Sequence, residues 1–259
     1  MQDNKLLRNT IGKVFKERSA VKRFLHRQLF YFCVLSFGVI CLSSCFVCML
    51  IGWVVPRMKG LPIGRRMIRN AFHVYLRLCD CLGVIHTDLA DLDALDNERG
   101  LILAPNHPSV IDVVLVNSRL SNVCCLMKAG LMDSPFLGAG ARLAGYVPND
   151  SFKAAVRASA ADIRAGGHLL IFPEGTRTET LPINKLKGGF ALISREAGCP
   201  IQTLIIEGNT GYLGKGWSIF KAPELPMRFS VRLGKRFPAT QDVATTAAEI
   251  EAYFRAELR

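Results

Sequence analysis

An uncharged segment between Arg27 and Arg57 constrains the fold of this chain more than any other feature. The 27 residues from Leu29 to Val55 are mostly apolar. As one helix they would be about 40 Å long, which exceeds the roughly 30 Å hydrocarbon core of a bilayer. The segment is therefore predicted to associate with a membrane and to tilt, bend or turn back instead of crossing straight.

Basic residues flank this apolar segment on both sides. Residues 1–27 carry eight Lys or Arg and two acids, and residues 57–77 carry six Lys or Arg and no acid. A single crossing would export one basic flank against the positive-inside rule. We therefore predict a re-entrant or in-plane helical pair on the inner (cytoplasmic) membrane, bent at Gly38 or at Ser43 and Ser44, with both ends cytoplasmic. A cleaved signal peptide is the alternative, but the apolar run is too long for one.

The overall charge favours an anionic lipid surface as partner. Lys and Arg number 33 against 21 Asp and Glu, in a chain that is half apolar. Nucleic acid is disfavoured because aromatic residues are few and no reader motif is present. Nine cysteines, an odd number without metal-binding spacing outside the apolar segment, predict neither a disulfide framework nor a metal site. This cysteine usage is typical of a reducing, cytoplasm-facing domain.

Beyond residue 62 the chain predicts an α/β fold, a mixed sheet flanked by helices, following the N-terminal membrane-associated helical segment. We divide it into residues 1–62, the basic N-terminus with the membrane segment, and 63–259, the catalytic domain. The strands are expected near Val84–Thr87, Leu101–Pro105, Val123–Met127, His168–Phe172, Ile201–Ile206 and Phe229–Leu233. The helices are expected near Ile63–Leu82, Ser109–Leu120, Ser151–Ala165, Gly189–Ala197 and from Thr240, its N-cap, to the end. The first of these helices is basic and amphipathic, and its apolar face comprises Ile63, Met67, Ala71, Val74 and Leu78.

A first polar cluster, Asn106–Asp112, falls where a strand ends and a helix begins, the usual place for α/β sites. From the first turns of the helix, the Asp112 carboxylate can reach back to His107 and fix one imidazole tautomer. The other ring nitrogen is then free to accept a proton, which makes the pair a candidate general-base dyad. The alternative is a histidine packed in a turn beside a solvated Asp112, because this spacing is common by chance.

A second cluster follows the strand that ends at Phe172. Glu174, Gly175, Thr176 and Arg177 form a charged loop in which the glycine permits a tight turn. Arg177 offers a planar fork of donors suited to a phosphate or carboxylate, and Glu174 can orient it or bind a hydroxyl. A bare turn with a surface ion pair is the alternative reading.

Together, NHxSxxD and, about 65 residues later, FPEGTR resemble the signature of the glycerolipid acyltransferases, which include the 1-acylglycerol-3-phosphate and lysophospholipid acyltransferases. The resemblance runs from about Leu82 to Glu207. It implies that His107 deprotonates a lysolipid hydroxyl and Asp112 orients the imidazole. The hydroxyl then attacks the acyl thioester of an acyl carrier protein or acyl-CoA, without metal, cofactor or acyl-enzyme.

The same resemblance implies acceptor-binding roles for other residues. Glu174, Gly175, Thr176 and Arg177 match the family's third motif, which is associated with acceptor binding. Lys128 precedes the region of the second motif, where it is either a phosphate contact or a surface lysine. Pro200 with Ile201 falls where the fourth, apolar motif is expected. The chain contains no GxSxG elbow, which disfavours an α/β-hydrolase.

The second family motif departs from its usual pattern here. It usually ends in an acidic residue and an arginine, and this chain has Asn149 and Asp150 instead. An anion in place of that arginine predicts that lysophosphatidic acid is not the best acceptor, unless Lys128, Arg142 or Arg177 compensates. The alternative is that Asn149 or Asp150 caps the next helix. Other acceptors, such as an aminolipid, a lipid A precursor or a specialised lipid, and a non-catalytic lipid-binding membrane protein are the rival functions.

Overall fold

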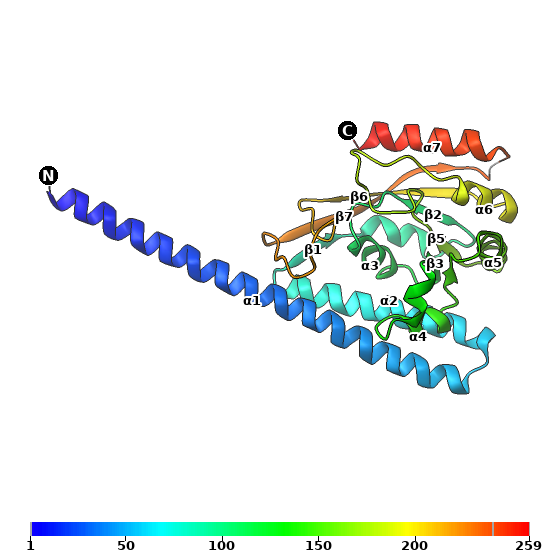
Figure 1. Ribbon diagram of the computed structural model, residues 1–259, viewed down its shortest axis with the longest axis horizontal. Coiled ribbons are helices and arrows are strands. Elements are labelled where there is room, and N and C mark those ends of the chain that lie inside the picture. The colour runs from blue at the N-terminus through cyan, green and yellow to red at the C-terminus, as the bar shows by residue number, and fades with distance from the viewer. Residues whose placement is uncertain (1, 240, 259) are drawn as a thin grey trace.

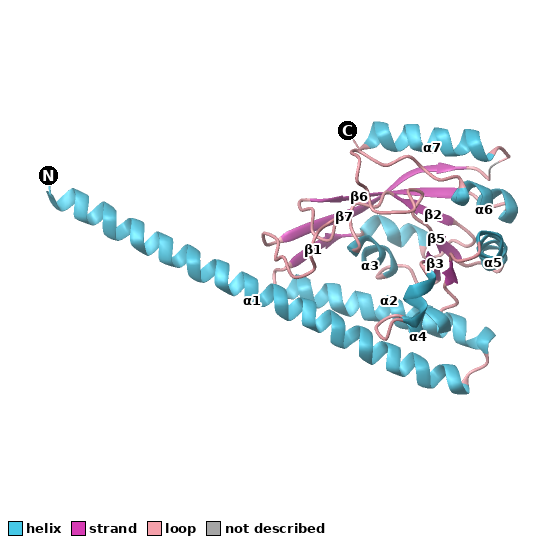
Figure 2. Cartoon of the chain, in the orientation of Figure 1, coloured by secondary structure: helices cyan, strands magenta, loops and turns pink. Residues whose placement is uncertain are grey.

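A seven-stranded sheet lies between two layers of helices (Figures 1 and 2). The computed structural model describes residues 2–239 and 241–258, with only the backbone described for residues 2–20. The helices are α1 (Gln2–Val54), α2 (Arg57–Cys81), α3 (Ile111–Asn117), α4 (Gly138–Leu143), α5 (Phe152–Arg164), α6 (Gly189–Ala197) and α7 (Val243–Glu257), with short 3₁₀ turns η1 (Ala90–Leu95) and η2 (Ala129–Asp133). The strands are β1 (Ile85–Asp88), β2 (Ile102–Pro105), β3 (Val123–Met127), β4 (Val147–Pro148), β5 (His168–Leu170), β6 (Ile201–Gly208) and β7 (Met227–Phe237).

The strand order is β1-β7-β6-β2-β5-β3-β4, and only the pair β6 and β7 is antiparallel. The predicted α/β mixed sheet is confirmed. All six predicted strands are present, while the short strand β4 was not predicted. Because β6, β2, β5, β3 and β4 run in one direction, their carboxyl ends meet at one edge of the sheet. Chain connections leave β2 and β5 toward opposite sides at this edge, which makes it the switch point of the fold.

The central strands are buried on both faces because helices cover both. In β2, Leu103 belongs to the core beneath α2 and α3, whereas Ile102 and Ala104 belong to the core beneath α5, α6 and α7. In β6, Leu204 and Ile205 alternate between the two cores in the same way. Figure 1 shows α7, α6 and α5 on one side of the sheet and α2 and α1 on the other.

The predicted bends inside the apolar segment are wrong, because α1 is one continuous helix from Gln2 to Val54. It passes through Gly38, Ser43 and Ser44 and extends far beyond the domain (Figure 1). The apolar segment therefore does not form a helical pair by itself. Instead α1 packs against α2, and the turn between them lies at Pro56, the N-cap residue of α2. A proline has no amide hydrogen and disfavours helical geometry in the residue before it, so the helix ends there.

One face of α1 belongs to the domain core and the other is exposed. Phe30, Cys33, Cys41, Cys45 and Cys48 are buried. The exposed residues of α1 from Tyr31 to Val54 are apolar with few exceptions, and include Phe32, Leu35, Val39, Leu42, Phe46, Leu50 and Trp53. Within the described residues, the stretch Val21–Val54 is long and apolar enough to cross a membrane, by length and composition alone.

Helix α2 connects α1 to the sheet. Its buried side packs closely on α4, since a Cβ on Gly64 would lie 2.5 Å from the amide nitrogen of Ala144. The buried Arg65 links α4 and α5 by donating to the carbonyl of Ala144 at 3.0 Å and to Asp162 at 2.6 Å. Of the predicted apolar face, Val74 is exposed and the other four residues are half-buried, with the Met67 sulfur 3.7 Å from the Cys48 sulfur of α1. The predicted domain boundary after residue 62 falls inside α2.

The C-terminal helix α7 is present as predicted. It begins at Val243, where the Asp242 carboxylate accepts the amide hydrogen of Ala244. The predicted cap, Thr240, lies outside the described residues.

Candidate active site

The end of β2 delivers His107 to the edge of the sheet at the switch point. Asn106 fixes this strand end, because its side-chain amide donates to the carbonyl of Ile206 at 2.9 Å and its oxygen accepts the Ile206 amide at 2.7 Å. These two hydrogen bonds hold the loop after β2 against β6. His107 is therefore held at a defined height above the sheet, with its side chain 14% exposed.

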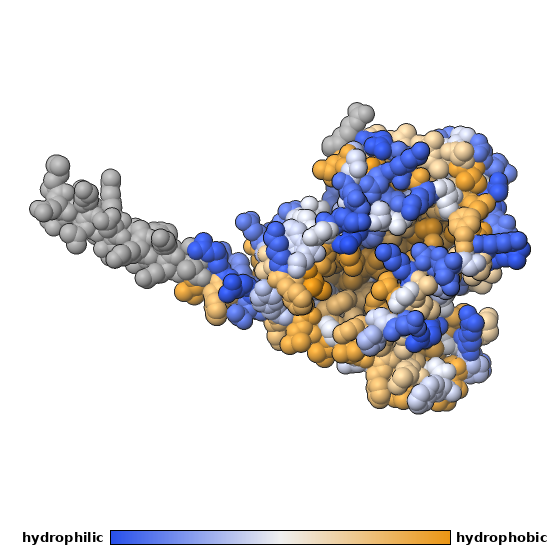
Figure 3. All heavy atoms as spheres, viewed as in Figure 1, coloured by the Kyte–Doolittle hydropathy of each residue, from blue (hydrophilic) through white to orange (hydrophobic). Residues whose placement is uncertain are grey.

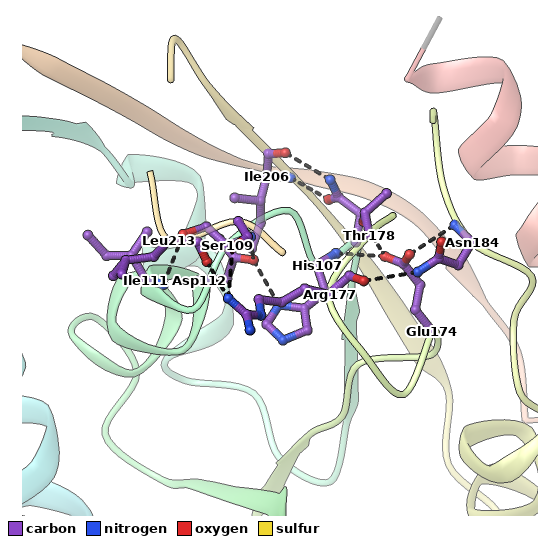
Figure 4. Close-up of polar contacts among 12 residues, drawn as sticks. His107, Ser109, Ile111, Asp112, Glu174, Arg177, Thr178, Asn184, Ile206 and Leu213 are labelled. Carbon is purple, nitrogen blue, oxygen red and sulfur yellow. Dashed lines mark hydrogen bonds and ion pairs between the residues drawn. The ribbon is translucent and has the colours of Figure 1, made fainter. Parts of the chain in front are cut away.

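His107 and Asp112 face one another as the spacing predicts. The His107 Nδ1 and Asp112 Oδ2 atoms are 2.9 Å apart, and the Ser109 amide donates to the same Oδ2 at 2.8 Å (Figure 4). The Asp112 side chain is fully buried. Burial raises the pKa of its carboxyl, against the opposing effects of the His107 ring and the Ser109 amide. The alternative of a solvated Asp112 is therefore wrong.

The third-motif loop holds the backbone of His107 on both sides. Glu174 Oε1 accepts the His107 amide at 2.9 Å, and the His107 carbonyl accepts the Thr178 amide at 2.8 Å (Figure 4). The same Glu174 carboxylate accepts the Thr178 hydroxyl at 2.8 Å and the Asn184 amide at 2.9 Å. Glu174 is only 1% exposed, so its carboxylate is occupied by groups of the chain itself.

Arg177 is bound to a loop that the sequence did not single out, residues 209–226 between β6 and β7. Its Nη1 donates to the carbonyls of Leu213 and Gly214, both at 2.9 Å. Within the same motif, Gly175 has a positive φ of 69°, which suits glycine. A Cβ there would lie 2.8 Å from the Nζ of Lys187, so this lysine lies across the motif loop. Thr176 is exposed.

An apolar cavity of about 250 Å³ lies next to the histidine. The Phe172 ring forms one of its walls and stacks on the His107 ring at a centroid distance of 3.7 Å. The cavity is lined by side chains from α1, α2, α3 and α4, their flanking loops and strand β3, among them Phe37, Cys41, Cys45, Cys48, Ile68, Phe72, Val113, Leu126, Met127, Phe136 and Ala141. Figure 3 shows a hollow with apolar walls on this face of the domain.

The other predicted residues lie at two different edges of the sheet. Lys128 follows β3 at the same edge as His107 and is exposed. Pro200 precedes β6 at the opposite, amino-terminal edge, where its carbonyl accepts the amide of Ile102, so it lies away from His107. Asn149 and Asp150 follow β4 and are exposed. Neither caps α5, whose N-cap residue is Ser151, and Asp150 accepts only the Ser151 amide outside the helix.

Sequence reasoning missed three contributors to the site. The stacking of Phe172 on His107, the position of Lys187 and the loop 209–226 all depend on contacts between distant segments. The apolar strand before FPEGTR marks Phe172 as a core residue and gives no sign of its contact with the histidine. The described residues contain no group of three or more His, Cys, Asp or Glu that could hold a metal ion.

Comparison with protein families matches residues 86–207 to the acyltransferase family. This stretch of the chain belongs to that family. The match covers both motifs and nearly coincides with the resemblance from Leu82 to Glu207, so the assignment to the acyltransferases is confirmed. None of the curated proteins compared matches the chain.

Among solved structures, the acyltransferase fold is shared with the 1-acyl-sn-glycerophosphate (LPA) acyltransferase PlsC from Thermotoga maritima. The TM-score is 0.68 at 16% sequence identity, over 92% of this chain and 96% of that one. Since the similarity covers 92% of this chain and so extends beyond residues 86–207, the paired N-terminal helices and the C-terminal strand β7 belong to the shared fold. The fold predicted for a glycerolipid acyltransferase is thereby confirmed.

Proposed function

We propose that this acyltransferase moves a fatty acyl chain from an acyl thioester to a hydroxyl of a lysolipid, with His107 as general base and Asp112 as its orienting partner. The observation that supports it best is the 2.9 Å contact between His107 Nδ1 and the buried Asp112 carboxylate, beside an apolar cavity that suits an acyl chain.

The proposed chemistry follows from the tautomer that Asp112 selects. A proton on Nδ1 donates to Asp112 Oδ2, so Nε2 carries a lone pair and accepts the proton of the acceptor hydroxyl. The hydroxyl oxygen attacks the thioester carbonyl, the new C–O bond forms, and the C–S bond breaks. The imidazolium then returns its proton to the leaving thiolate. Acyl-CoA and acyl carrier protein offer the same thioester, so either can serve as donor.

We propose that Glu174 is a positioning residue. Its carboxylate accepts three hydrogen bonds, one of them from the His107 amide, and it lies too deep in the chain to contact substrate. The predicted acceptor-binding role then falls to Thr176 and Arg177 of this motif, together with the exposed Lys128 after β3.

Glu174→Gln is expected to lower kcat about tenfold to a hundredfold, because a glutamine amide group must face at least one backbone donor and the His107 loop shifts. The melting temperature should also fall. Glu179→Gln is the matched control, since Glu179 lies in the same loop but is exposed. Turnover and melting temperature of Glu174→Gln equal to those of this control would contradict the positioning role.

The apolar cavity is the proposed site of the acyl chain. Gly140 of α4 faces its wall, because a Cβ there would lie 3.8 Å from Ile68 and 3.9 Å from the sulfurs of Cys45 and Cys48. These are ordinary van der Waals distances, so an alanine fits without strain, whereas a side chain larger than alanine extends into the cavity. The volume near Gly140 therefore limits the length of the chain.

Gly140→Val is expected to shift donor preference toward shorter acyl chains. Loss of space for about two methylenes, each worth about 0.8 kcal/mol, should lower kcat/KM for the longest accepted donor about tenfold relative to a donor four carbons shorter. Gly140→Ala is the control and should leave the ratio nearly unchanged. The ratio is measured with a series of acyl-CoA donors. If the dependence of kcat/KM on donor chain length were unchanged in Gly140→Val, the acyl chain would not occupy this cavity.

The function is tested by an acyl-transfer screen of the purified protein with both donor types against a panel of lysolipids. Transfer to at least one lysolipid is expected, and none with any donor would contradict the proposal. Because Asp150 places an anion at the sheet edge, lysophosphatidic acid should react more slowly than an acceptor with a less anionic or differently placed head group.

Asp150→Arg should then raise the rate with lysophosphatidic acid relative to the preferred acceptor. Glu249→Arg changes the net charge equally from the exposed outer side of α7 and serves as control. If lysophosphatidic acid reacted faster than every other acceptor and Asp150→Arg did not raise this rate further, the inference about the acceptor would be wrong.

We also propose that α1 and the outer side of α2 lie in one leaflet of the inner membrane, with both ends and the catalytic domain on the cytoplasmic side. The exposed face of α1 is apolar over residues 31–54 apart from Ser43 and Gly52. On α2, the exposed Arg66 and Arg77 lie beside the apolar strip that includes Val74. An apolar face bordered by arginines suits the boundary between acyl chains and anionic head groups.

A further inference from the structure

The tip of the loop 209–226, residues 217–221, carries exposed apolar side chains. Ile219 is 49% and Phe220 72% exposed. Lys221 lies with its Nζ 4.7 Å from the centre of the Trp217 ring, and the Trp217 indole donates to the Lys221 carbonyl at 2.9 Å. Aromatic rings favour the head-group region of a bilayer and a lysine amine attracts anionic lipids. The composition of this tip therefore suits a membrane interface.

The tip lies at the border of the apolar face of α1. The Tyr31 hydroxyl donates to the Phe220 carbonyl at 3.0 Å. Leu35 and Leu42, four and eleven residues further along α1, lie on the same side of the helix as Tyr31 and are exposed. The apolar tip and the apolar helix face are thus parts of one continuous surface.

The base of the same loop contacts the catalytic motifs. The Tyr212 carbonyl accepts the Ser109 hydroxyl at 2.7 Å, and the Leu213 carbonyl accepts the amide of Val110. The Leu213 carbonyl also accepts the guanidinium of Arg177 (Figure 4). The Tyr212 ring also packs edge-on against Phe30 of α1, with centroids 5.5 Å apart. One loop therefore contacts α1 and both motifs and carries the exposed tip.

We propose that residues 217–221 contact an anionic bilayer beside the apolar face of α1, and that this added contact fixes the height of His107 above the lipid surface. The inference rests on the membrane association proposed above. A bilayer is favoured as the occupant because the tip continues the apolar face of α1 and ends in an exposed lysine.

The contact is tested by tryptophan fluorescence in vesicles of phosphatidylcholine and phosphatidylglycerol that contain nitroxide-labelled lipid. The chain has two tryptophans, so Trp217→Phe leaves Trp53 of α1 as the only reporter. Phe220→Trp in a chain carrying Trp53→Phe and Trp217→Phe reports on the tip. Phe152→Trp in the same background is the matched control, since Phe152 is 63% exposed on α5, on the opposite face of the sheet from α1 (Figure 1).

Quenching by labelled lipid is expected for Trp53 and for Phe220→Trp, and not for Phe152→Trp. Circular dichroism confirms that each variant is folded. If Trp53 is quenched while Phe220→Trp is quenched no more than Phe152→Trp, α1 binds the membrane and the tip does not, which overturns the inference alone. Quenching of none of the three would overturn the membrane association as well, and acyl transfer in detergent would show whether the enzymatic proposal survives.

Discussion

Acyl transfer should fall by about two to four orders of magnitude in His107→Ala, the usual effect of losing a general base. The histidine side chain contributes little to the core, since it is partly exposed and contacts mainly Phe172 and Asp112. Its backbone bonds to Glu174 and Thr178 do not depend on the side chain. Folding and vesicle binding should therefore persist while turnover is lost.

The loss is measured as kcat with any lysolipid that the wild-type protein accepts. His86→Ala is the control, because His86 also pairs with an aspartate, Asp80, but lies on β1 away from the motifs. Near wild-type turnover in His107→Ala would show that the proposed base is wrong.

Asp112→Asn should lower kcat by about a thousandfold or more, as in other enzymes in which the orienting carboxylate of a histidine is replaced by its amide. An asparagine whose oxygen takes the place of Oδ2 keeps the bonds to Nδ1 and to the Ser109 amide, but it lacks the negative charge that stabilises the imidazolium. An asparagine whose amino group faces Nδ1 requires the proton on Nε2, and the ring then no longer accepts a proton there. Substrate binding should change little, since Asp112 is fully buried.

The same variant should not lower the melting temperature, because the asparagine oxygen can take the place of Oδ2 and still accept the Ser109 amide. Burial raises the pKa of the Asp112 carboxyl, and its Oδ1 has no hydrogen-bond partner among the described residues. Replacing a buried charge by a neutral group of the same shape removes a desolvation cost of the folded state. Turnover close to wild type would contradict the orienting role, and a large drop in melting temperature together with lost activity would indicate a structural role instead.

The pattern of apolar and polar residues was sufficient to predict six of the seven strands of the sheet. Strands such as Val123–Met127 and helices such as Gly189–Ala197 are short, well-bounded segments whose ends coincide with turns. The strand β4 was missed because two residues, Val147 and Pro148, give no periodicity. The bend in the apolar segment was misplaced because lipid thickness, applied to Leu29–Val55 alone, could not anticipate that α1 packs one face on the protein.

The site was predictable where the interaction is local and was missed where it is not. His107 and Asp112 are five residues apart, so helix geometry alone brings them together. The bonds from Glu174 to His107 and from Arg177 to Leu213 join segments 67 and 36 residues apart. Such contacts depend on strand order, which the spacing of motifs along the chain does not specify.

Helix α1 has one consequence for how this enzyme can diverge. Cys41, Cys45 and Cys48 line the proposed acyl cavity, while Leu42 and Phe46, on alternate positions of the same turns, face outward. A shift or rotation of this helix that suits a thicker or thinner bilayer would also reshape the cavity. A mutation in α1 that adapts the enzyme to a new membrane therefore also alters its preference for acyl chain length. Replacing α1 by the membrane helix of another protein would change which fatty acids the enzyme accepts.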